Sequence, residues 1–168
     1  MRLREMHEWK RTMSRVVERI PVIPLEDMKT LFKRRMGLLC NERSIGVMPI
    51  LLPEEAPITH GSESYTTITP SPVRVKMEIT NDTYGLFIPA LYESRSESLD
   101  IIDSGHMTRI MVYEGSFRGL IRQGDTVEAS GIIQKVTPSD PNDEVFYQMM
   151  VGSKAGAGKE FIRLVKED

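Results

Sequence analysis

The chain has little of what disulfide-stapled, membrane-spanning or metal-binding proteins need. Cys40 is the only cysteine among 168 residues, so no intrachain disulfide is possible, and we expect a reducing, cytoplasmic environment. No run of about 18 apolar residues is present, so we expect no membrane contact. His7, His60 and His106 lie far apart, and no zinc-type spacing joins them. The sequence therefore predicts no metal site and no cofactor.

The composition that is present is typical of one soluble globular domain, or of a small domain with a helical extension. The chain is 40% hydrophobic and 27% charged. Its charge is uneven: residues 1–43 carry a balance of +5, and residues 44–168 carry −7. A basic arm that meets nucleic acid explains this asymmetry, and so do two solvated helices docked on an acidic barrel.

Two helices are predicted before residue 44. Apolar residues recur at helical spacing over residues 2–20, and Pro21 and Pro24 end that helix. A second helix is predicted from Leu25 to Met36, with acidic residues in its first turn and Gly37 as its stop. The sequence therefore predicts a helical N-terminal segment over residues 1–43.

The rest of the chain reads as short strands separated by turns. Residues 73–79 alternate apolar and charged side chains, which indicates a half-buried strand, and a turn at 81–83 leads into a returning strand over 84–92. Residues 53–72 and 93–106 read as loops. Further strands are predicted at 45–52, 107–114, 126–136, 145–151 and 160–165. This spacing favours an OB-like Greek-key barrel over residues 44–168. The predicted fold class is α+β, with an N-terminal helical hairpin followed by a mainly antiparallel OB-like β-barrel.

Gly131 lies in the middle of the predicted strand 126–136, which Gly124 and Asp125 precede at a turn. Glycine inside a strand marks a bulge, a sharp bend or a close backbone approach. Bends of this kind let a small sheet coil into a barrel.

Four stretches carry a resemblance to a known family. They are Lys33-Arg-Arg-Met-Gly37 with Asn41-Glu-Arg-Ser-Ile45; Val73-Arg-Val-Lys-Met-Glu-Ile-Thr80; Tyr84-Gly-Leu-Phe-Ile-Pro-Ala-Leu-Tyr92; and Val112-Tyr-Glu-Gly-Ser-Phe-Arg-Gly119 followed by Gly124-Asp-Thr-Val-Glu-Ala-Ser-Gly131. From Glu26 onward the chain resembles the C-terminal half of archaeal proteins described as predicted nucleotidyltransferases. The resemblance implies an accessory region, because the family's catalytic Gly-Ser turn and Asp-x-Asp pair belong to a preceding domain. It carries over no catalytic residue.

Two motifs imitate catalytic or phosphate-binding sites. Gly115-Ser116 with Asp125 and Glu128 resembles a nucleotidyltransferase signature, but acids three apart on a strand point to opposite faces and cannot share a metal pair. Ser153 to Lys159 resembles a phosphate-binding loop, but Ser153 stands at the first glycine position and Glu160 follows the lysine. We interpret the first motif as a turn aspartate with a strand glutamate, and the second as a hairpin loop.

A nucleic-acid interface is the best-supported binding site in the sequence. An OB-like face binds single strands by stacking bases on aromatic side chains beside a basic groove. The candidate phosphate contacts are Arg34, Arg35, Arg118 and Arg122, and the candidate stacking residues are Tyr84 and Tyr113. The −7 balance of residues 44–168 opposes tight nonspecific binding.

Three functional hypotheses follow. The first is a non-catalytic accessory module that binds single-stranded DNA, RNA or a substrate, with a catalytic nucleotidyltransferase domain or chain as a further partner. The second is a protein-interaction or oligomerisation module that uses the apolar face of residues 2–20, including Met6 and Met13. The third is an independent nucleotidyltransferase, which conflicts with the missing pair of carboxylates.

Overall fold

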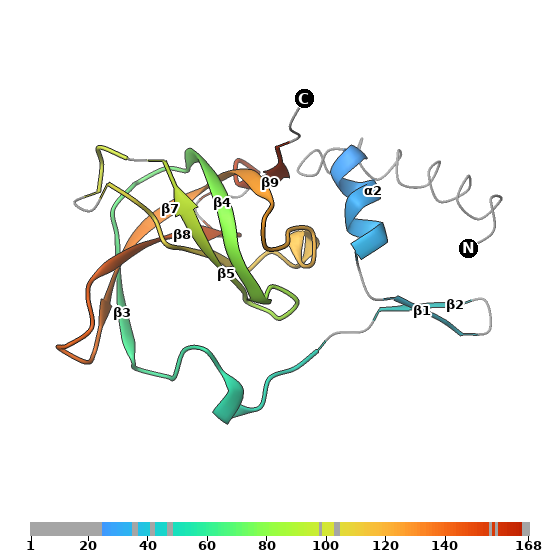
Figure 1. The fold of residues 1–168 in the computed structure, drawn as a ribbon, viewed down its shortest axis with the longest axis horizontal. Coiled ribbons are helices and arrows are strands. Elements are labelled where there is room, and N and C mark those ends of the chain that lie inside the picture. The colour runs from blue at the N-terminus through green and yellow to red at the C-terminus, as the bar shows by residue number, and fades with distance from the viewer. Residues whose placement is uncertain are drawn as a thin grey trace.

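The structure is a computed structural model that describes residues 25–34, 37–40, 43–46, 49–97, 99–102, 105–154, 156 and 158–165. Its elements follow one another as α2 (Leu25–Arg34), β1 (Gly37–Cys40), β2 (Arg43–Gly46), η1 (Pro53–Glu55), β3 (Glu63–Thr67), β4 (Val73–Tyr84), β5 (Ala90–Ser96), β6 (Arg109–Val112), η2 (Gly115–Phe117), β7 (Thr126–Pro138), β8 (Phe146–Val151) and β9 (Phe161–Leu164) (Figure 1). Strands dominate, and most belong to one sheet.

Five strands of this sheet close into a barrel. β4, β5 and β6 form an antiparallel meander, and β6 then pairs in parallel with β8. The long strand β7 completes the ring, because its first half pairs with β4 and its second half pairs with β8. Closure removes the exposed sheet edges that an open sheet leaves. β3 and β9 are additional strands that pair with β7 outside the ring.

Gly131 lies where β7 changes partner. It is the last residue of β7 paired with β4, opposite Val73, and the next residue, Ile132, is paired with Met150 of β8. A Cβ at this position would lie 2.8 Å from Cγ of Met149 and closer still to the Met150 carbonyl oxygen. Of the three alternatives that the mid-strand glycine indicated, the structure has a close backbone approach, because only a residue without a Cβ lets β8 come this near.

The barrel interior is filled by alternate residues of its strands. Val75, Met77 and Ile79 of β4 are buried, whereas Arg74, Lys76 and Glu78 between them are exposed, as their period-two pattern predicted. Tyr92, Ile110, Ile133 and Met149 bring the other four strands into the same cluster. Phe117 of η2 is also fully buried there.

The single α-helix of the described residues docks on the outside of this barrel. Leu31 of α2 is buried, and Oδ2 of the buried Asp27 accepts a hydrogen bond from the Leu164 N–H of β9 at 3.3 Å. The helix ends near the turn before β7, where Arg34 donates to the Leu120 carbonyl at 2.8 Å. Figure 1 accordingly shows α2 beside β9 and the barrel end.

The predicted α+β class with an N-terminal helical hairpin is wrong. The described residues contain one ten-residue α-helix, α2, which corresponds to the second predicted helix, and the β-hairpin of β1 and β2 begins within the segment predicted to be helical. The predicted helix over residues 2–20 lies outside the described residues. The chain is mainly β, built on the closed five-stranded barrel, and the barrel part of the expectation is confirmed. The division at residues 43 and 44 stays a prediction.

Several boundaries differ from the sequence prediction for identifiable reasons. The turn of the first hairpin lies at residues 85–89 rather than 81–83, because Asn81 accepts hydrogen bonds from Thr83 while staying within β4. The supposed loop over 53–72 contains β3, in which Glu63 is half-buried and Ser64–Thr67 are all exposed, so burial does not alternate along it. Residues 49–52 of the predicted strand 45–52 are not in a strand. Within the described residues, no helix has the length and apolar character needed to cross a membrane.

Candidate functional site

An apolar groove of about 420 Å³ lies between the β4–β5 turn and the connection that precedes β3. The β4–β5 turn forms one wall, and the connection from Pro49 to Ile58 forms the other. Leu91 of β5 and Met111 of β6 form the floor and are directly opposite each other in the sheet. None of the described residues that line the groove is charged.

The β4–β5 turn is held in place by the core. The buried Tyr92 hydroxyl donates a hydrogen bond to the Gly85 carbonyl at 2.9 Å, and burial raises the pKa of that hydroxyl far above its usual range. The turn then presents Tyr84 and Phe87 to the groove, with their ring centroids 6.1 Å apart. This separation is within the range of favourable aromatic pairs, so the two rings form a preformed aromatic wall.

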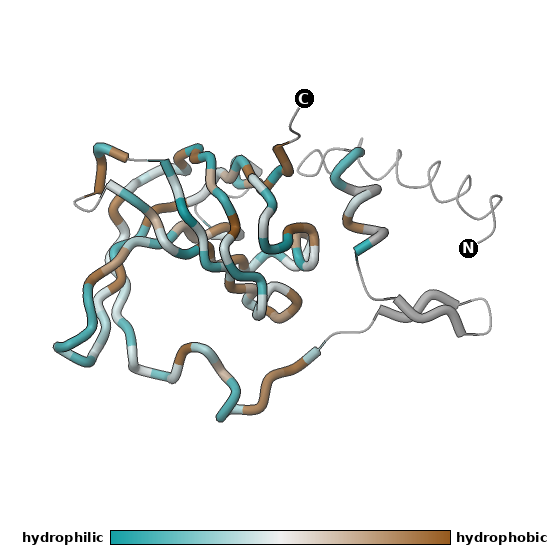
Figure 2. Tube along the Cα trace, viewed as in Figure 1, coloured by the Kyte–Doolittle hydropathy of each residue, from teal (hydrophilic) through white to brown (hydrophobic). Residues whose placement is uncertain are grey.

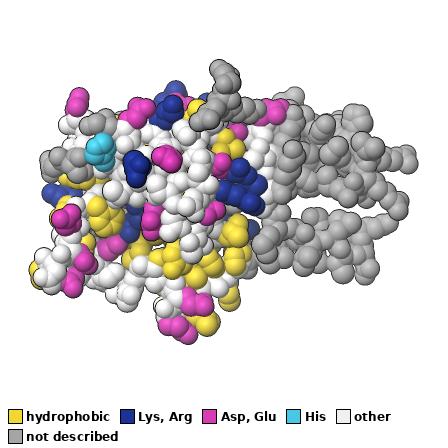
Figure 3. All heavy atoms as spheres, in the orientation of Figure 1, with side chains coloured by type: hydrophobic (Ala, Val, Ile, Leu, Met, Phe, Trp, Pro, Cys, Tyr) yellow, Lys and Arg dark blue, Asp and Glu magenta, His cyan; other side chains and the backbone are white. Residues whose placement is uncertain are grey.

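The opposite wall is unusually exposed for its composition. Ile50 and Leu52 expose 81% and 53% of their surface, and Ile88 across the groove exposes 48%. Figure 2 shows hydrophobic residues along this connection before η1, and Figure 3 shows an apolar patch over the same region of the surface. Clustered exposed apolar side chains mark interaction sites, whereas scattered ones are ordinary.

Three acidic side chains lie beside this groove and form an acidic rim. Glu54 and Glu55 are exposed in η1, between Leu51 and Ala56 of the wall. Glu114 is exposed and precedes Gly115, where a Cβ would lie 3.5 Å from Ile88. Hydrogen bonds from the Ser116 hydroxyl and N–H lower the pKa of the Glu114 carboxyl. The rim therefore carries negative charge at neutral pH and favours cationic groups on a ligand.

The three described arginines of the predicted phosphate site lie around the segment 118–125. Arg34 forms a bidentate ion pair with Asp125, and the Asp125 carboxylate also accepts from the Arg122 N–H at 2.8 Å. The Arg122 side chain is exposed. Arg118 has a buried Nη1 atom without a hydrogen-bond partner in the part of the chain that the structure describes. Arg35 lies outside the residues whose side chains are described.

The two predicted stacking tyrosines have different surroundings. Tyr84 lines the apolar groove, and its neighbour Gly85 accepts a hydrogen bond from the Gly119 N–H at 3.3 Å, which brings the turn close to Arg118. Tyr113 exposes 51% of its surface at the end of β6. The groove wall formed by residues 49–58 was not predicted from the sequence, because the apolar run Ile50-Leu51-Leu52 was interpreted as part of a strand.

A second cluster, made of polar side chains, joins β3 to β6 and β8 on the outer face of the barrel. Arg109 of β6 donates to both carboxylate oxygens of Glu63, at 2.9 and 2.7 Å, and to Oε1 of Gln148 at 2.7 Å. Burial raises the pKa of Glu63, but the hydrogen bonds from Arg109 and Tyr65 and the Arg109 charge outweigh it and bring the pKa below 4.5. Burial and the Glu63 carboxylate together raise the pKa of Tyr65 to about 12. The Arg109 guanidinium is directed at protein acceptors, so we assign this cluster a structural role.

The motifs that imitate catalytic sites are structural in the described residues. At the start of the loop 153–159, the buried Glu160 carboxylate accepts from the Gly152 and Ser153 N–H groups at 2.6 Å each. These two N–H groups are thus satisfied by an internal anion. Asp125 is a turn aspartate, as predicted. No group of three or more potential metal ligands occurs in the described part of the chain.

Comparison with known proteins supplies no relative from which a function could be transferred. No family model, curated protein or solved structure matches this chain. The nucleotidyltransferase resemblance therefore stays a prediction, and the site is interpreted from its own geometry.

Proposed function

We propose that this protein is a binding module whose apolar groove takes a polypeptide segment with an apolar core and basic flanks. The observation that carries this proposal is the groove between the β4–β5 turn and residues 49–58, with exposed aliphatic walls and no charge among its described lining residues. Burying side chains such as Ile50 and Ile88 against a partner removes apolar surface from water at roughly 25 cal/mol per Å².

The barrel topology supports a role in binding rather than in catalysis. Around the ring the strands follow the order β4, β5, β6, β8, β7, and β6 and β8 are parallel. With the five strands numbered along the chain, this is the order 1-2-3-5-4 of an OB-type Greek-key barrel. The groove lies at the connection between the first and second of these strands, where OB-type barrels bind oligonucleotides and oligosaccharides. The acidic rim selects a cationic polypeptide over a polyanion.

Labelled peptides with a short leucine core test this proposal. Fluorescence anisotropy should give tighter binding to a lysine-flanked peptide than to a glutamate-flanked one, and added salt should reduce the difference. Ile88→Ser should weaken binding at least about fivefold, because a buried apolar contact contributes roughly 1 kcal/mol or more. Ile101→Ser is the matched control, since Ile101 is equally exposed, at 49%, but does not line the groove. Equal affinity for the two flanks, or equal loss in both variants, contradicts the proposal.

Single-stranded nucleic acid is a second candidate, favoured by the arginines around segment 118–125. Arg122 is exposed, and Figure 3 shows basic side chains gathered on this face. Anisotropy with single-stranded DNA and RNA across a salt series tests this candidate. Arg122→Ala should lower the salt slope by about 1, whereas the exposed Arg95→Ala should not. Affinity no tighter than about 1 mM at low salt ends this candidate.

A further inference from the structure

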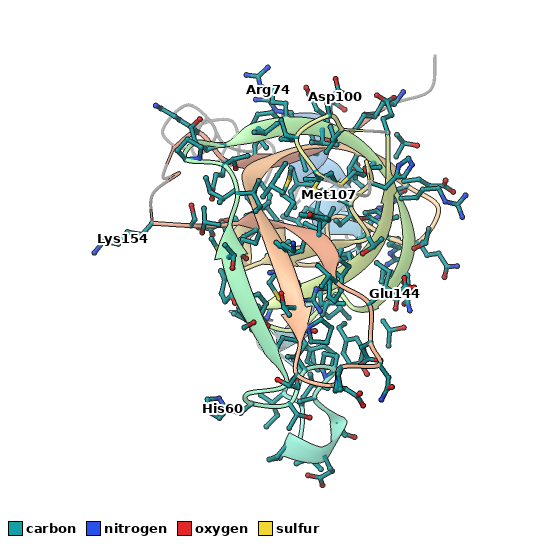
Figure 4. All side chains as sticks on the ribbon, turned by 90° about the vertical axis from the view of Figure 1, so that its left-hand side faces the viewer. His60, Arg74, Asp100, Met107, Glu144 and Lys154 are labelled. Carbon is teal, nitrogen blue, oxygen red and sulfur yellow. The ribbon has the colours of Figure 1, made fainter. Side chains whose placement is uncertain are left out.

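The outer edge of β3 is an open pairing surface. In the described part of the chain, β7 is the only strand hydrogen-bonded to β3, which stands at the end of the sheet order. The residues Ser64 to Thr67 are exposed, with Tyr65 at 45%. Figure 4 shows β3 at the side of the barrel, and no described element runs along its outer edge. Proteins blunt such edges with lysine, proline or bulges, and the sequence of β3 contains neither lysine nor proline.

The register with β7 fixes which backbone groups face this edge. The Ile68 N–H donates to the Ile133 carbonyl, and the Ser139 N–H donates to the Ser62 carbonyl. Hydrogen-bonded pairs alternate along an antiparallel ladder, so Ser64 and Thr66 also direct their N–H and C=O groups toward β7. The N–H and C=O groups of Glu63, Tyr65 and Thr67 consequently point to the open edge.

We propose that β3 pairs antiparallel with β3 of a second copy of this chain, around a two-fold axis at Tyr65. Of the possible occupants, a second copy fits because the strand Glu63–Thr67 is self-complementary in this register. Tyr65 faces its own counterpart, Ser64 faces Thr66, and Glu63 faces Thr67. No like charges oppose each other within this strand pair, and the outward groups form up to about six backbone hydrogen bonds.

The side chains support this pairing. Opposed tyrosines are favourable cross-strand neighbours, as are hydroxyl pairs such as Ser64 with Thr66. The Tyr65 hydroxyl donates to Glu63 at 2.7 Å, and Glu63 is held in turn by Arg109. The edge is thus preorganised by the barrel, which lowers the entropic cost of association.

A charge placed opposite Glu63 tests the register. Sedimentation velocity on the full chain should show a monomer–dimer equilibrium between about 10 μM and 1 mM. Thr67→Glu creates two Glu–Glu pairs across the axis and should weaken dimerisation roughly tenfold, with recovery in high salt. Thr67→Gln should dimerise like the wild type. Thr66→Glu adds the same charge opposite Ser64 and should have the smaller effect.

A cross-linking experiment gives an independent readout. In a Cys40→Ser background, Tyr65→Cys should form an intermolecular disulfide under mild oxidation, because Cα atoms of a directly hydrogen-bonded pair lie about 5.5 Å apart. Thr67→Cys lies too far from its own counterpart and should not cross-link. A chain that stays monomeric at about 1 mM, or a dimer that ignores Thr67→Glu and does not cross-link through position 65, overturns the proposal.

Discussion

Gly131→Ala tests the close approach on which barrel closure depends. The added Cβ would lie 2.8 Å from Cγ of Met149 and closer still to the Met150 carbonyl oxygen. The Met149 side chain is fully buried in the core, and the Met150 carbonyl belongs to the β7–β8 ladder and moves only with the strand. Overpacking of this kind costs about 1–3 kcal/mol, and the backbone contact places Gly131→Ala near 3 kcal/mol.

The control for this prediction is Gly124→Ala. Gly124 has a φ of +87°, but no described atom lies within 4 Å of an added Cβ, so its substitution costs only the strain of a left-handed residue, about 1 kcal/mol. Urea unfolding followed by circular dichroism gives both values. Gly131→Ala should also lower Tm by about 6–12 °C. A Gly131→Ala protein within about 0.5 kcal/mol of the wild type would refute the closure argument.

Three further predictions concern the buried polar contacts. Arg109→Met should lower the free energy of unfolding, measured in urea, by about 3 kcal/mol, because it leaves the Glu63 carboxylate without its partner. The double variant Arg109→Met with Glu63→Gln should recover most of this loss. Because the pKa of Glu63 is lowered in the folded protein, the ionised carboxylate stabilises the fold above pH 4.5, and this stabilisation is lost as the pH falls through the folded pKa. Acid unfolding of Glu63→Gln should therefore be less steep in this pH range than that of the wild type. An unchanged profile contradicts the assignment. Glu160→Ala should cost about 2 kcal/mol and speed amide exchange at Gly152 and Ser153, whereas Glu160→Gln should cost less, because it keeps an acceptor.

The sequence predicted those parts of the fold that a local pattern encodes. β4 alternates apolar and charged residues because one face lines the core, so its position was predictable. A special role for Gly131 was predictable because a glycine in the middle of a strand weakens it, but the sequence left a bulge, a bend and a close backbone approach open. β3 was missed because both its faces are accessible to solvent and its position depends on β7, which lies about 70 residues further along the chain.

The candidate site was less predictable than the barrel. Tyr84 was predicted as a stacking residue for nucleic acid, which stays a prediction; its place in the groove depends on Phe87 and on residues 49–58, which only the tertiary structure brings to it. Arg34 was predicted as a free phosphate contact, yet its guanidinium pairs with Asp125, and no pattern in the sequence links these two residues. Long-range ion pairs leave no periodic pattern in the sequence. Counting charged residues therefore locates the arginines but does not show which of them already pair with a carboxylate.

Mapping the groove by NMR is the most direct test of the proposed function. A ¹⁵N-labelled sample of the full chain is titrated with the lysine-flanked leucine peptide. Our account predicts that the largest amide shifts fall on residues 84–91, on Met111 and on residues 50–58, and that Ile88→Ser reduces them. Shifts confined to segment 118–125, or no saturable shifts at all, would contradict the assignment of the groove as the binding site.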